Sequence, residues 1–267
     1  MGSVTEPWHN QLIRELESAG FKTETSLHEN FNLLFLHEGK IVLNLMDIGS
    51  DRLPEELVNI QNIFKRKEIQ LIHLWEDVFL SRKDQVLSRL KSLIGQNIKI
   101  HGRKTEVIRL SQKDADEFLN VNHLQFSVGA KYRYGLTVGG KIVAVACFSG
   151  LRKMHNGIAD YKSAELIRFA NLLGTTVIGG FTKLLSHYIK LHKPNDVMSY
   201  ADRDWSIGLA YERAGFTLIE ATSPAAIIVE KNTLVRTFTH RLSETSKKDE
   251  YIEVFNTGNL KYIFYCE

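Results

Sequence analysis

Short apolar runs of strand length alternate with amphipathic helical segments along the whole chain, and this alternation constrains the fold more than any other feature. Residues 40–46 (KIVLNLM) exemplify the first kind, and residues 54–67 exemplify the second. In such an alternation the strands bury their apolar faces in sheets that helices cover. The pattern therefore predicts an α/β (α+β) protein, and 267 residues are enough for two domains.

The first hundred residues predict seven elements in the order α-β-β-β-α-β-α. Apolar residues at helical spacing end at Gly20 and Gly95, and Pro54 stands early in the middle helix, where proline is tolerated. Glu38-Gly39 is a plausible tight turn between two strands. The predicted helices are 8–19, 54–67 and 78–94, and the predicted strands are 21–27, 31–37, 40–46 and 69–74.

This order resembles the core of the restriction-endonuclease-like nucleases, and the very-short-patch-repair type in particular. The resemblance implies a Mg²⁺ site with acidic ligands on two neighbouring strands, because this hard cation prefers oxygen ligands beside the scissile phosphate. The matching positions hold the amides Asn32 and Asn44. We therefore predict a degenerate nuclease-like domain without a metal. An active Mg²⁺-dependent homing-type endonuclease that uses Glu38, Lys40 and Asp47 stays open as an alternative.

Residues 98–104 are short, polar and basic, and we predict that they link a domain of residues 1–97 to a domain of residues 105–267. Gly139-Gly140 between two apolar runs predicts a β-hairpin, and Ser111 with Asp114 predicts a capped helix start. The predicted strands are 105–110, 132–138, 141–148, 163–170, 196–200 and 216–220, and strands at 225–230, 234–239, 251–255 and 260–265 form a C-terminal β extension. The predicted helices are 112–120, a helix that the segment 173–180 opens and that lasts to about 192, and 206–214.

The order of elements in the second domain resembles the GNAT acyltransferase fold, which implies a mixed sheet. In that family a glycine-rich turn with the pattern (Q/R)-x-x-G-x-(G/A) begins a helix whose backbone N–H groups hold the pyrophosphate of acyl-CoA. The matching stretch is 176–181 (TVIGGF), in which only the first glycine fits. The resemblance implies an acyl-CoA-type donor held by Thr175, Thr176, Gly179, Gly180 and Lys183. Alternatively, the two glycines only allow a strand and a helix to pack closely.

A more specific resemblance covers most of residues 100–267. Its markers are the segments 123–125 (HLQ), 131–136 (KYRYGL), 164–169 (AELIRF), 175–180 (TTVIGG) and 199–216 (SYADRDWSIGLAYERAGF). They resemble the C-terminal domain of bacteriophage proteins described as homing endonucleases, and the last run is similar to the Mom-type DNA-modification proteins. This resemblance implies a nucleic-acid partner, with DNA preferred over RNA.

The residues themselves suggest how such a site would work. Asp202 follows a strand and suits a general base, Tyr211 suits a general acid, and His123 is a third catalytic candidate. The mixture of charge and aromatic rings expected for an extruded base or a single strand is supplied by Gln125, Lys131, Tyr132, Arg133, Arg168, Tyr200, Arg203 and Trp205. We expect Arg133, Arg168, Arg203 and Asp202 to converge on one cleft. Asp202 as a turn residue and Tyr211 as a core residue remain alternatives.

Charge and composition limit the remaining possibilities. Residues 1–100 hold 12 Lys/Arg against 14 Asp/Glu, a net charge of −2, and residues 101–267 hold 22 against 17, a net charge of +5. The two cysteines form no disulfide framework, and no apolar run approaches the ~18 residues of a membrane span. We therefore expect a cytoplasmic protein without a membrane partner. The favoured hypothesis is a nucleic-acid-directed protein whose second domain binds DNA or RNA, with transfer of an acyl-type group to a base or amine as its candidate reaction. A GNAT N-acyltransferase that acts on a small molecule or uses an aminoacyl-tRNA donor is a further candidate, and a non-enzymatic binding module stays open.

Overall fold

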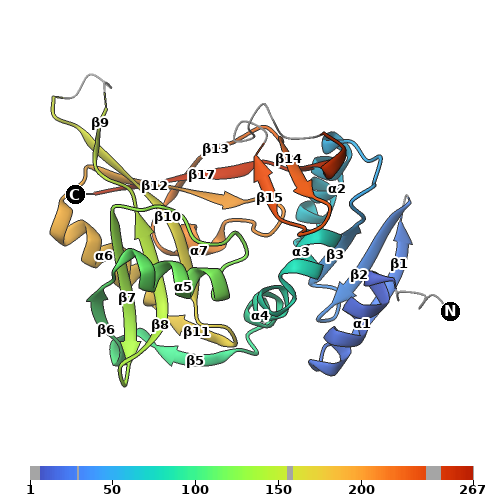
Figure 1. The fold of residues 1–267 in the computed structure, drawn as a ribbon, viewed down its shortest axis with the longest axis horizontal. Helices are drawn as coiled ribbons and strands as arrows, with labels where there is room; N and C mark the ends of the chain where they lie inside the picture. Colours follow the sequence, from blue (N-terminus) through green and yellow to red (C-terminus); the bar gives the residue numbers. More distant parts are fainter. Residues whose placement is uncertain (1–6, 29, 155–158, 239–247, 267) are drawn as a thin grey trace. The chain divides into compact units, whose positions relative to one another are not determined.

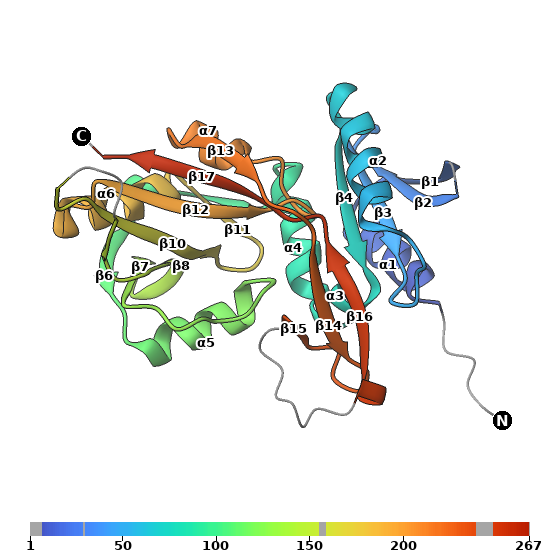
Figure 2. The same ribbon diagram turned by 90° about the horizontal axis from the view of Figure 1, so that it is seen from above.

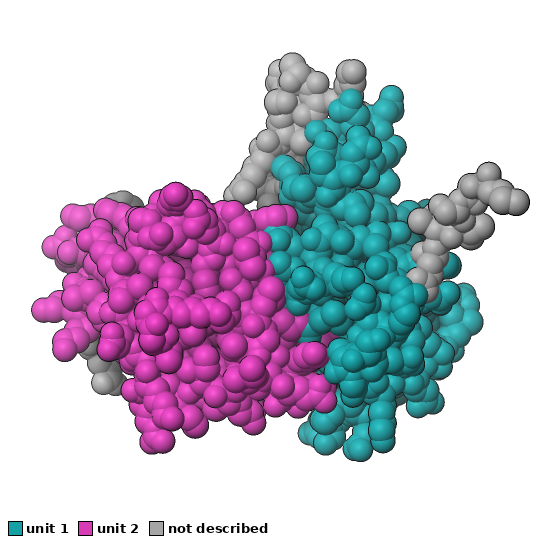
Figure 3. Space-filling view, turned by 60° about the horizontal axis from the view of Figure 1, so that its bottom comes forward, with its two compact units in different colours: residues 1–87, 201–207, 221–260 teal, residues 88–200, 208–220, 261–267 magenta. Residues whose placement is uncertain are grey.

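The chain folds into two compact units, each assembled from three separate segments (Figures 1 and 3). The computed structural model describes residues 7–28, 30–154, 159–238 and 248–266. Unit 1 comprises residues 1–87, 201–207 and 221–260, and unit 2 comprises residues 88–200, 208–220 and 261–267. The structure thus divides the chain differently from the predicted domains 1–97 and 105–267.

Unit 1 contains the predicted α-β-β-β-α-β-α order with one difference. The predicted helix over 78–94 is divided at Arg82 into two helices. In the residue before the break, the Ser81 hydroxyl donates a hydrogen bond to the Asp77 carbonyl oxygen at 2.6 Å. Polar side chains of this kind compete with the helical hydrogen-bond pattern. The elements are α1 (Trp8–Ser18), β1 (Thr23–His28), β2 (Phe31–Leu36), β3 (Ile41–Met46), α2 (Pro54–Arg66), β4 (Gln70–Trp75), α3 (Glu76–Ser81) and α4 (Lys83–Leu93), of which residues 88–93 belong to unit 2.

The sheet of unit 1 has the order β1-β2-β3-β4. β1, β2 and β3 are antiparallel, and β3 and β4 are parallel because α2 connects them. All six residues of β3 are buried, as expected for an apolar strand inside a sheet. The core of this unit contains the buried face of α2 (Leu57, Ile60 and Phe64).

The C-terminal β extension packs into the same core. β14 (Ala225–Glu230), β15 (Arg236–Phe238) and β16 (Tyr251–Asn256) form a three-stranded sheet of order β15-β14-β16, with the short 3-10 helix η3 (Lys248–Glu250) before β16. Ile227, Val229 and Val254 belong to one hydrophobic cluster with residues of β2, β3 and β4. Hydrophobic burial therefore assigns this segment to unit 1. Thr239, the last residue of one predicted strand, lies outside the described residues.

Unit 2 contains a mixed sheet of order β13-β17-β12-β10-β8-β7-β6, with β9 paired to β10. Val145 and Cys147 of β8 pack against α5, whereas Phe148 stacks on Tyr188 of α6 at 4.0 Å between ring centroids. Because successive side chains of a strand point to opposite faces, α5 and α6 cover opposite faces of this sheet (Figure 2). The elements are β6 (Glu106–Arg109), α5 (Gln112–Asn122), β7 (Tyr132–Val138), β8 (Lys141–Phe148), β9 (Arg152–Lys153), β10 (Lys162–Asn171), α6 (Gly180–His192), β12 (Asp196–Asp202), α7 (Leu209–Arg213), β13 (Thr217–Ala221) and β17 (Asn259–Tyr265).

The predicted linker is folded. Within it, β5 (Ile98–His101) pairs in parallel with β11 (Thr175–Ile178), and a short 3-10 helix, η1 (Gly102–Lys104), follows. Its polar and basic composition is typical of a loop, but its backbone donors and acceptors have a partner far along the chain. Among the described helices, none has the length and apolar character needed to span a membrane.

Candidate functional site

Two parallel strands in the sheet of unit 2 pair over only part of their lengths and then part. β10 and β12 pair in register from Ser163↔Asp196 to Leu166↔Ser199, although β10 continues to Asn171 and β12 continues to Asp202. The pairing of β10 with β8 also shifts register between Leu166 and Arg168. A shift of this kind bends a strand away from its neighbour. The carboxyl end of a parallel strand pair is where open α/β sheets bind their ligands.

Tyr211 lies at this parting of β10 and β12. Its hydroxyl is 3.0 Å from Ser199 Oγ, and Ser199 Oγ donates a hydrogen bond to the Leu166 carbonyl oxygen at 2.8 Å. Ser199 and Leu166 are the last residues of the paired register, so the parting begins at this phenol. Burial raises the pKa of Tyr211, while the hydrogen bond with Ser199 and the charges of Arg89 and Arg168 act in the opposite direction.

Aromatic rings pack closely around Tyr211. Its ring stacks on Tyr262, with centroids 5.1 Å apart and planes inclined by 11°. The ring of Phe181 contacts Tyr211 at 5.5 Å and Phe169 of β10 at 5.2 Å between centroids. Phe181 therefore fills space beside the tyrosine ring. It is also the residue at which the GNAT pattern has a small side chain.

Helix α6 begins in the predicted glycine-rich turn. Gly179 has φ +74°, and a Cβ added there would meet no atom within 4 Å. Gly180 is confined, because a Cβ there would lie 2.8 Å from Val177 and 3.1 Å from Leu136. Gly180 thus allows close packing, as the alternative interpretation held. The space at Gly179 and the first N–H groups of α6 suit an anion such as a pyrophosphate.

The three side chains predicted to assist this turn are directed elsewhere. Lys183 Nζ donates to the carbonyl oxygens of Gly102 at 3.0 Å and Thr105 at 2.5 Å. Thr175 Oγ1 donates to Leu172 O at 2.7 Å, and Thr176 Oγ1 is hydrogen-bonded to Ser92 Oγ at 3.2 Å. The backbone of the turn therefore suits an anion, whereas these side chains stabilise unit 2 itself.

Arg133 and Arg168 lie on the α5 face of the sheet. Both are paired in register with Cys147, Arg133 from β7 and Arg168 from β10, so the three residues form a row across three strands. Arg168 Nε donates to Phe126 O at 3.4 Å, and Arg133 donates to Gln112 Oε1 at 3.0 Å and to Ala130 O. Burial raises the pKa of the Cys147 thiol to about 12, so this cysteine is not a nucleophile at neutral pH.

The remaining substrate candidates of unit 2 are divided between surface and core. Lys131, Gln125 and Tyr200 are exposed, and Gln125 N donates to His123 Nδ1 at 3.0 Å. Tyr132 is not free for stacking, because its ring lies 3.9 Å from His192 and 5.8 Å from Tyr188 between centroids.

Asp202, Arg203 and Trp205 belong to unit 1, so the four residues expected to share a cleft do not share a compact unit. Asp202 Oδ1 accepts a hydrogen bond from Asp204 N at 3.0 Å, which is the turn role given above as the alternative. Arg203 donates to Thr257 O at 3.1 Å, and Trp205 is buried. In this environment all three have structural partners within unit 1.

The residues of the nuclease alternative are too far apart for one metal site. Glu38 lies in the turn before β3 with φ +57°, next to Lys40, whereas Asp47 follows the last residue of β3. At about 3.4 Å per residue, the six residues of the strand separate its ends by roughly 20 Å. Asp47 instead accepts a hydrogen bond from Trp8 Nε1 at 2.6 Å. In the described parts of the chain, no three His, Cys, Asp or Glu side chains are grouped as metal ligands.

The two amides of the nuclease-like domain have different surroundings. Asn32 is exposed, whereas Asn44 is buried and its Nδ2 lies 3.0 Å from His73 Nδ1. His73 Nε2 lies 3.1 Å from the Leu57 carbonyl oxygen, and burial lowers the pKa of His73 to about 3. This imidazole is therefore neutral, and it joins β3 and β4 to α2.

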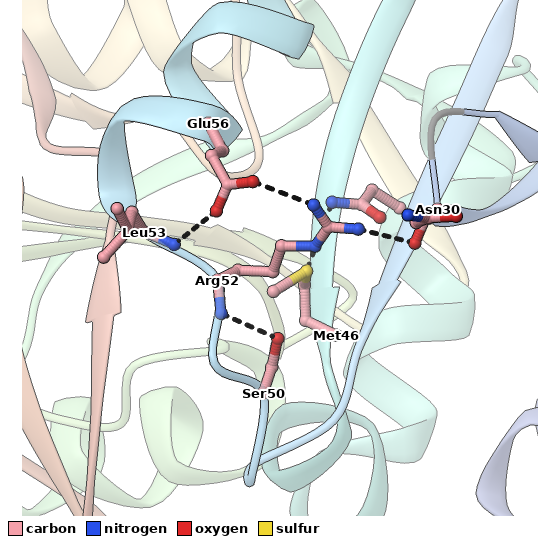
Figure 4. Close-up of polar contacts among 7 residues, drawn as sticks. Asn30, Met46, Ser50, Arg52, Leu53 and Glu56 are labelled. Carbon is pink, nitrogen blue, oxygen red and sulfur yellow. Dashed lines mark hydrogen bonds and ion pairs between the residues drawn. The ribbon is translucent and has the colours of Figure 1, made fainter.

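A second polar network secures the start of α2 in unit 1 (Figure 4). Arg52 donates to Glu56 Oε1 at 2.9 Å and to Asn30 O at 2.7 Å, and its guanidinium lies 4.1 Å from the centroid of the Phe31 ring. Leu53 N donates to Glu56 Oε2 at 2.7 Å. The hydrogen bond from Leu53, followed by that from Arg52, lowers the pKa of Glu56. These contacts hold a helix and a strand, and they leave Arg52 and Glu56 in structural roles.

Charge separates sharply between the two units. Unit 1 holds 15 Lys/Arg against 21 Asp/Glu, a net charge of −6, and unit 2 holds 19 against 10, a net charge of +9. The site at Tyr211 is therefore on a strongly basic unit. A field of this sign favours anionic partners and raises their association rate.

Three residues near the site are not among the site residues predicted from the sequence: Ser199, Phe181 and Phe126. Ser199 opens the 199–216 run, and Phe181 is the residue that departs from the GNAT pattern, so both had a signal in the sequence. Phe126 lies in the polar-aromatic segment between His123 and Lys131, and its distinguishing feature is a backbone φ of +59°. No sequence signal predicts that conformation.

No family model and no curated protein sequence matches the chain. Solved structures similar to it include the IAA acetyltransferase from Bacillus cereus (13% identity, 61% of this chain, 99% of that chain, TM-score 0.38). The ribosomal-protein-S18-alanine N-acetyltransferase from Escherichia coli is also similar (15% identity, 60% and 93%, TM-score 0.37). A GNAT family acetyltransferase from Elizabethkingia anophelis, solved with acetyl-CoA bound, is a third (11% identity, 61% and 99%, TM-score 0.35).

Proposed function

We propose that unit 2 transfers an acyl group from a CoA-type donor to an amine carried by a nucleic acid. The observation that carries this proposal is the parting of the parallel strands β10 and β12 at Leu166 and Ser199, with the Tyr211 hydroxyl bound there. This geometry places a proton donor, the Tyr211 hydroxyl, at the point where the two strands part. The glycine-rich start of α6 adds an anion-binding turn.

Tyr211 is the general acid of the proposed reaction. Its raised pKa keeps the phenol protonated at neutral pH, so that Oη holds a proton that the departing sulfur of a thioester needs. Ser199 Oγ, at 3.0 Å, fixes the position of that oxygen. A bound thioester would supply the activated acyl group. As the amine nitrogen bonds to the acyl carbon and the carbon–sulfur bond breaks, Tyr211 gives its proton to the sulfur, and the proton that the amine loses restores the phenol. The backbone N–H groups that follow Gly179 hold the pyrophosphate of the donor.

The basic character of unit 2 supports a nucleic acid as the carrier of the amine. A net charge of +9 attracts phosphates, and Arg168 both donates a hydrogen bond to the Phe126 carbonyl oxygen and acts through its charge on the pKa of Tyr211. Guanidinium groups suit phosphate recognition better than ammonium groups. A small amine would require no such excess of positive charge.

The test measures transfer of a labelled acetyl group from acetyl-CoA to single-stranded DNA, RNA and a small polyamine in parallel. We expect transfer to nucleic acid, and we expect Tyr211→Phe to reduce the rate by about 100-fold or more, because general acids contribute 10²–10⁴. Tyr265→Phe is the matched control, since Tyr265 is 57% exposed at the end of β17. Transfer to the polyamine alone would exclude the nucleic-acid acceptor, and no transfer to any amine would refute the proposal.

A further inference from the structure

Phe126 presents an exposed aromatic ring from a strained loop of unit 2. Its φ of +59° is unusual for a bulky residue, and its side chain is 39% exposed. Hydrogen bonds fix the loop on both sides, since Ser127 N donates to Asn120 Oδ1 at 3.0 Å and Phe126 N donates to His123 O at 3.4 Å. The chain thus holds an apolar ring at the surface in a fixed position.

The loop is attached to the basic row of the α5 face. Arg168 Nε donates to the carbonyl oxygen of Phe126 at 3.4 Å, and Arg168 lies beside Cys147 in the row that Arg133 completes. Arg168 follows Leu166, at which the pairing of β10 with β12 ends. Arg168 therefore links the two features: it is hydrogen-bonded to the backbone of Phe126, and it lies two residues after the point at which β10 and β12 part.

We propose that Phe126 is the surface on which an unpaired or extruded nucleobase stacks while its phosphate contacts Arg168. This inference rests on the proposed function, and it names the form of the acceptor. An aromatic ring stacks on any base, and a base within a duplex is not accessible to chemistry until it leaves the stack. The net charge of +9 on unit 2 selects a polyanion over a neutral or cationic peptide as the partner of this ring.

The experiment measures binding of a fluorescein-labelled single-stranded oligodeoxyadenylate to the full chain by fluorescence anisotropy over a range of salt concentrations. Stacking contributes about 1–3 kcal/mol per base, so Phe126→Ala is expected to weaken binding by roughly 10- to 100-fold with an unchanged salt slope. Phe126→Tyr and Phe126→Trp keep a ring and are expected to bind like the native chain. Val138→Ala is the matched control, because Val138 is also 39% exposed, in the β7–β8 hairpin.

Arg168→Gln gives the complementary result, a salt slope reduced by about one phosphate contact. Equal affinity of Phe126→Ala and the native chain would overturn the inference, and so would weakening by Phe126→Ala that neither aromatic variant restores. Absence of any salt-dependent binding by the native chain would overturn both this inference and the nucleic-acid acceptor. Ring-dependent binding without acyl transfer would support the stacking surface and refute only the transfer reaction.

Discussion

The ion pair between Asp77 and Arg236 provides the sharpest test of how the chain divides into units. Arg236 donates to both carboxylate oxygens of Asp77, at 2.6 and 2.9 Å, although the two residues are 159 positions apart. The Asp77 side chain is 1% exposed and that of Arg236 is 24% exposed. The pair joins α3 to β15, and it lies entirely within unit 1.

Asp77→Asn removes the charge and keeps the shape of the side chain. Loss of one partner of a buried pair costs 3–5 kcal/mol, and the partial exposure of Arg236 places this variant near the lower limit, about 3 kcal/mol in the free energy of unfolding. With a urea dependence of about 1–3 kcal/mol per M, the midpoint of unfolding falls by roughly 1–3 M.

Tryptophan fluorescence is the appropriate assay, because all three tryptophans, Trp8, Trp75 and Trp205, lie in unit 1 and are buried. The fluorescence transition therefore reports the unit that contains the pair. The double variant Asp77→Asn with Arg236→Met is expected to be less destabilised than the sum of the single variants, because neither charge is then left unpaired. A shift below about 0.3 M in Asp77→Asn, or additive single effects, would refute the assignment of β15 to this unit.

Two further predictions concern His73 and Ser199. The folded-state pKa of His73 is about 3, below the unfolded value of about 6.5, so the unfolded state binds more protons in this window and stability falls as the pH decreases. The expected slope is about 1.4 kcal/mol per pH unit in urea unfolding followed by tryptophan fluorescence, and a slope that persists in His73→Met would assign it to other groups. Ser199→Ala is expected to lower the rate of acyl transfer by about tenfold or less without changing the KM for acetyl-CoA, because one hydrogen bond to Tyr211 is lost. Ser199→Thr keeps the hydroxyl and should restore the rate, and a change confined to KM would contradict the role given to Ser199.

Most elements of the fold are predictable from the sequence because their signals lie within a few residues. The two-residue turn Gly139-Gly140 has φ values of +56° and +79°, the conformation that its sequence favours. Ser111 accepts a hydrogen bond from Asp114 N at 3.1 Å, as its position before a helix indicated. Hairpins, caps and helical faces are local, so one sequence is enough to identify them.

Pairings between distant segments are not predictable in this way. β5 finds its partner β11 more than seventy residues later, and Ile98 of β5 is 70% exposed, so no buried apolar pattern marks the strand. The side chains of the glycine-rich turn show the same limit. Lys183 has the right position in sequence to meet a phosphate, but the nearby carbonyl oxygens of Gly102 and Thr105 bind its ammonium group instead.

The discontinuous units also change what the net charge means. A division near residue 100 gives −2 and +5, which is a weak signal for an anionic partner, whereas the units defined by contacts carry −6 and +9. The difference of four charges arises mainly because three basic residues of the first hundred, Arg89, Lys91 and Lys99, belong to unit 2, whereas residues 201–207 and 221–260 bring six Lys/Arg and seven Asp/Glu to unit 1. Electrostatic potential depends on where charges lie in space and not on their order along the chain. An excess of nine positive charges on 133 residues is the property that a polyanionic acceptor would require of the unit that contains Tyr211.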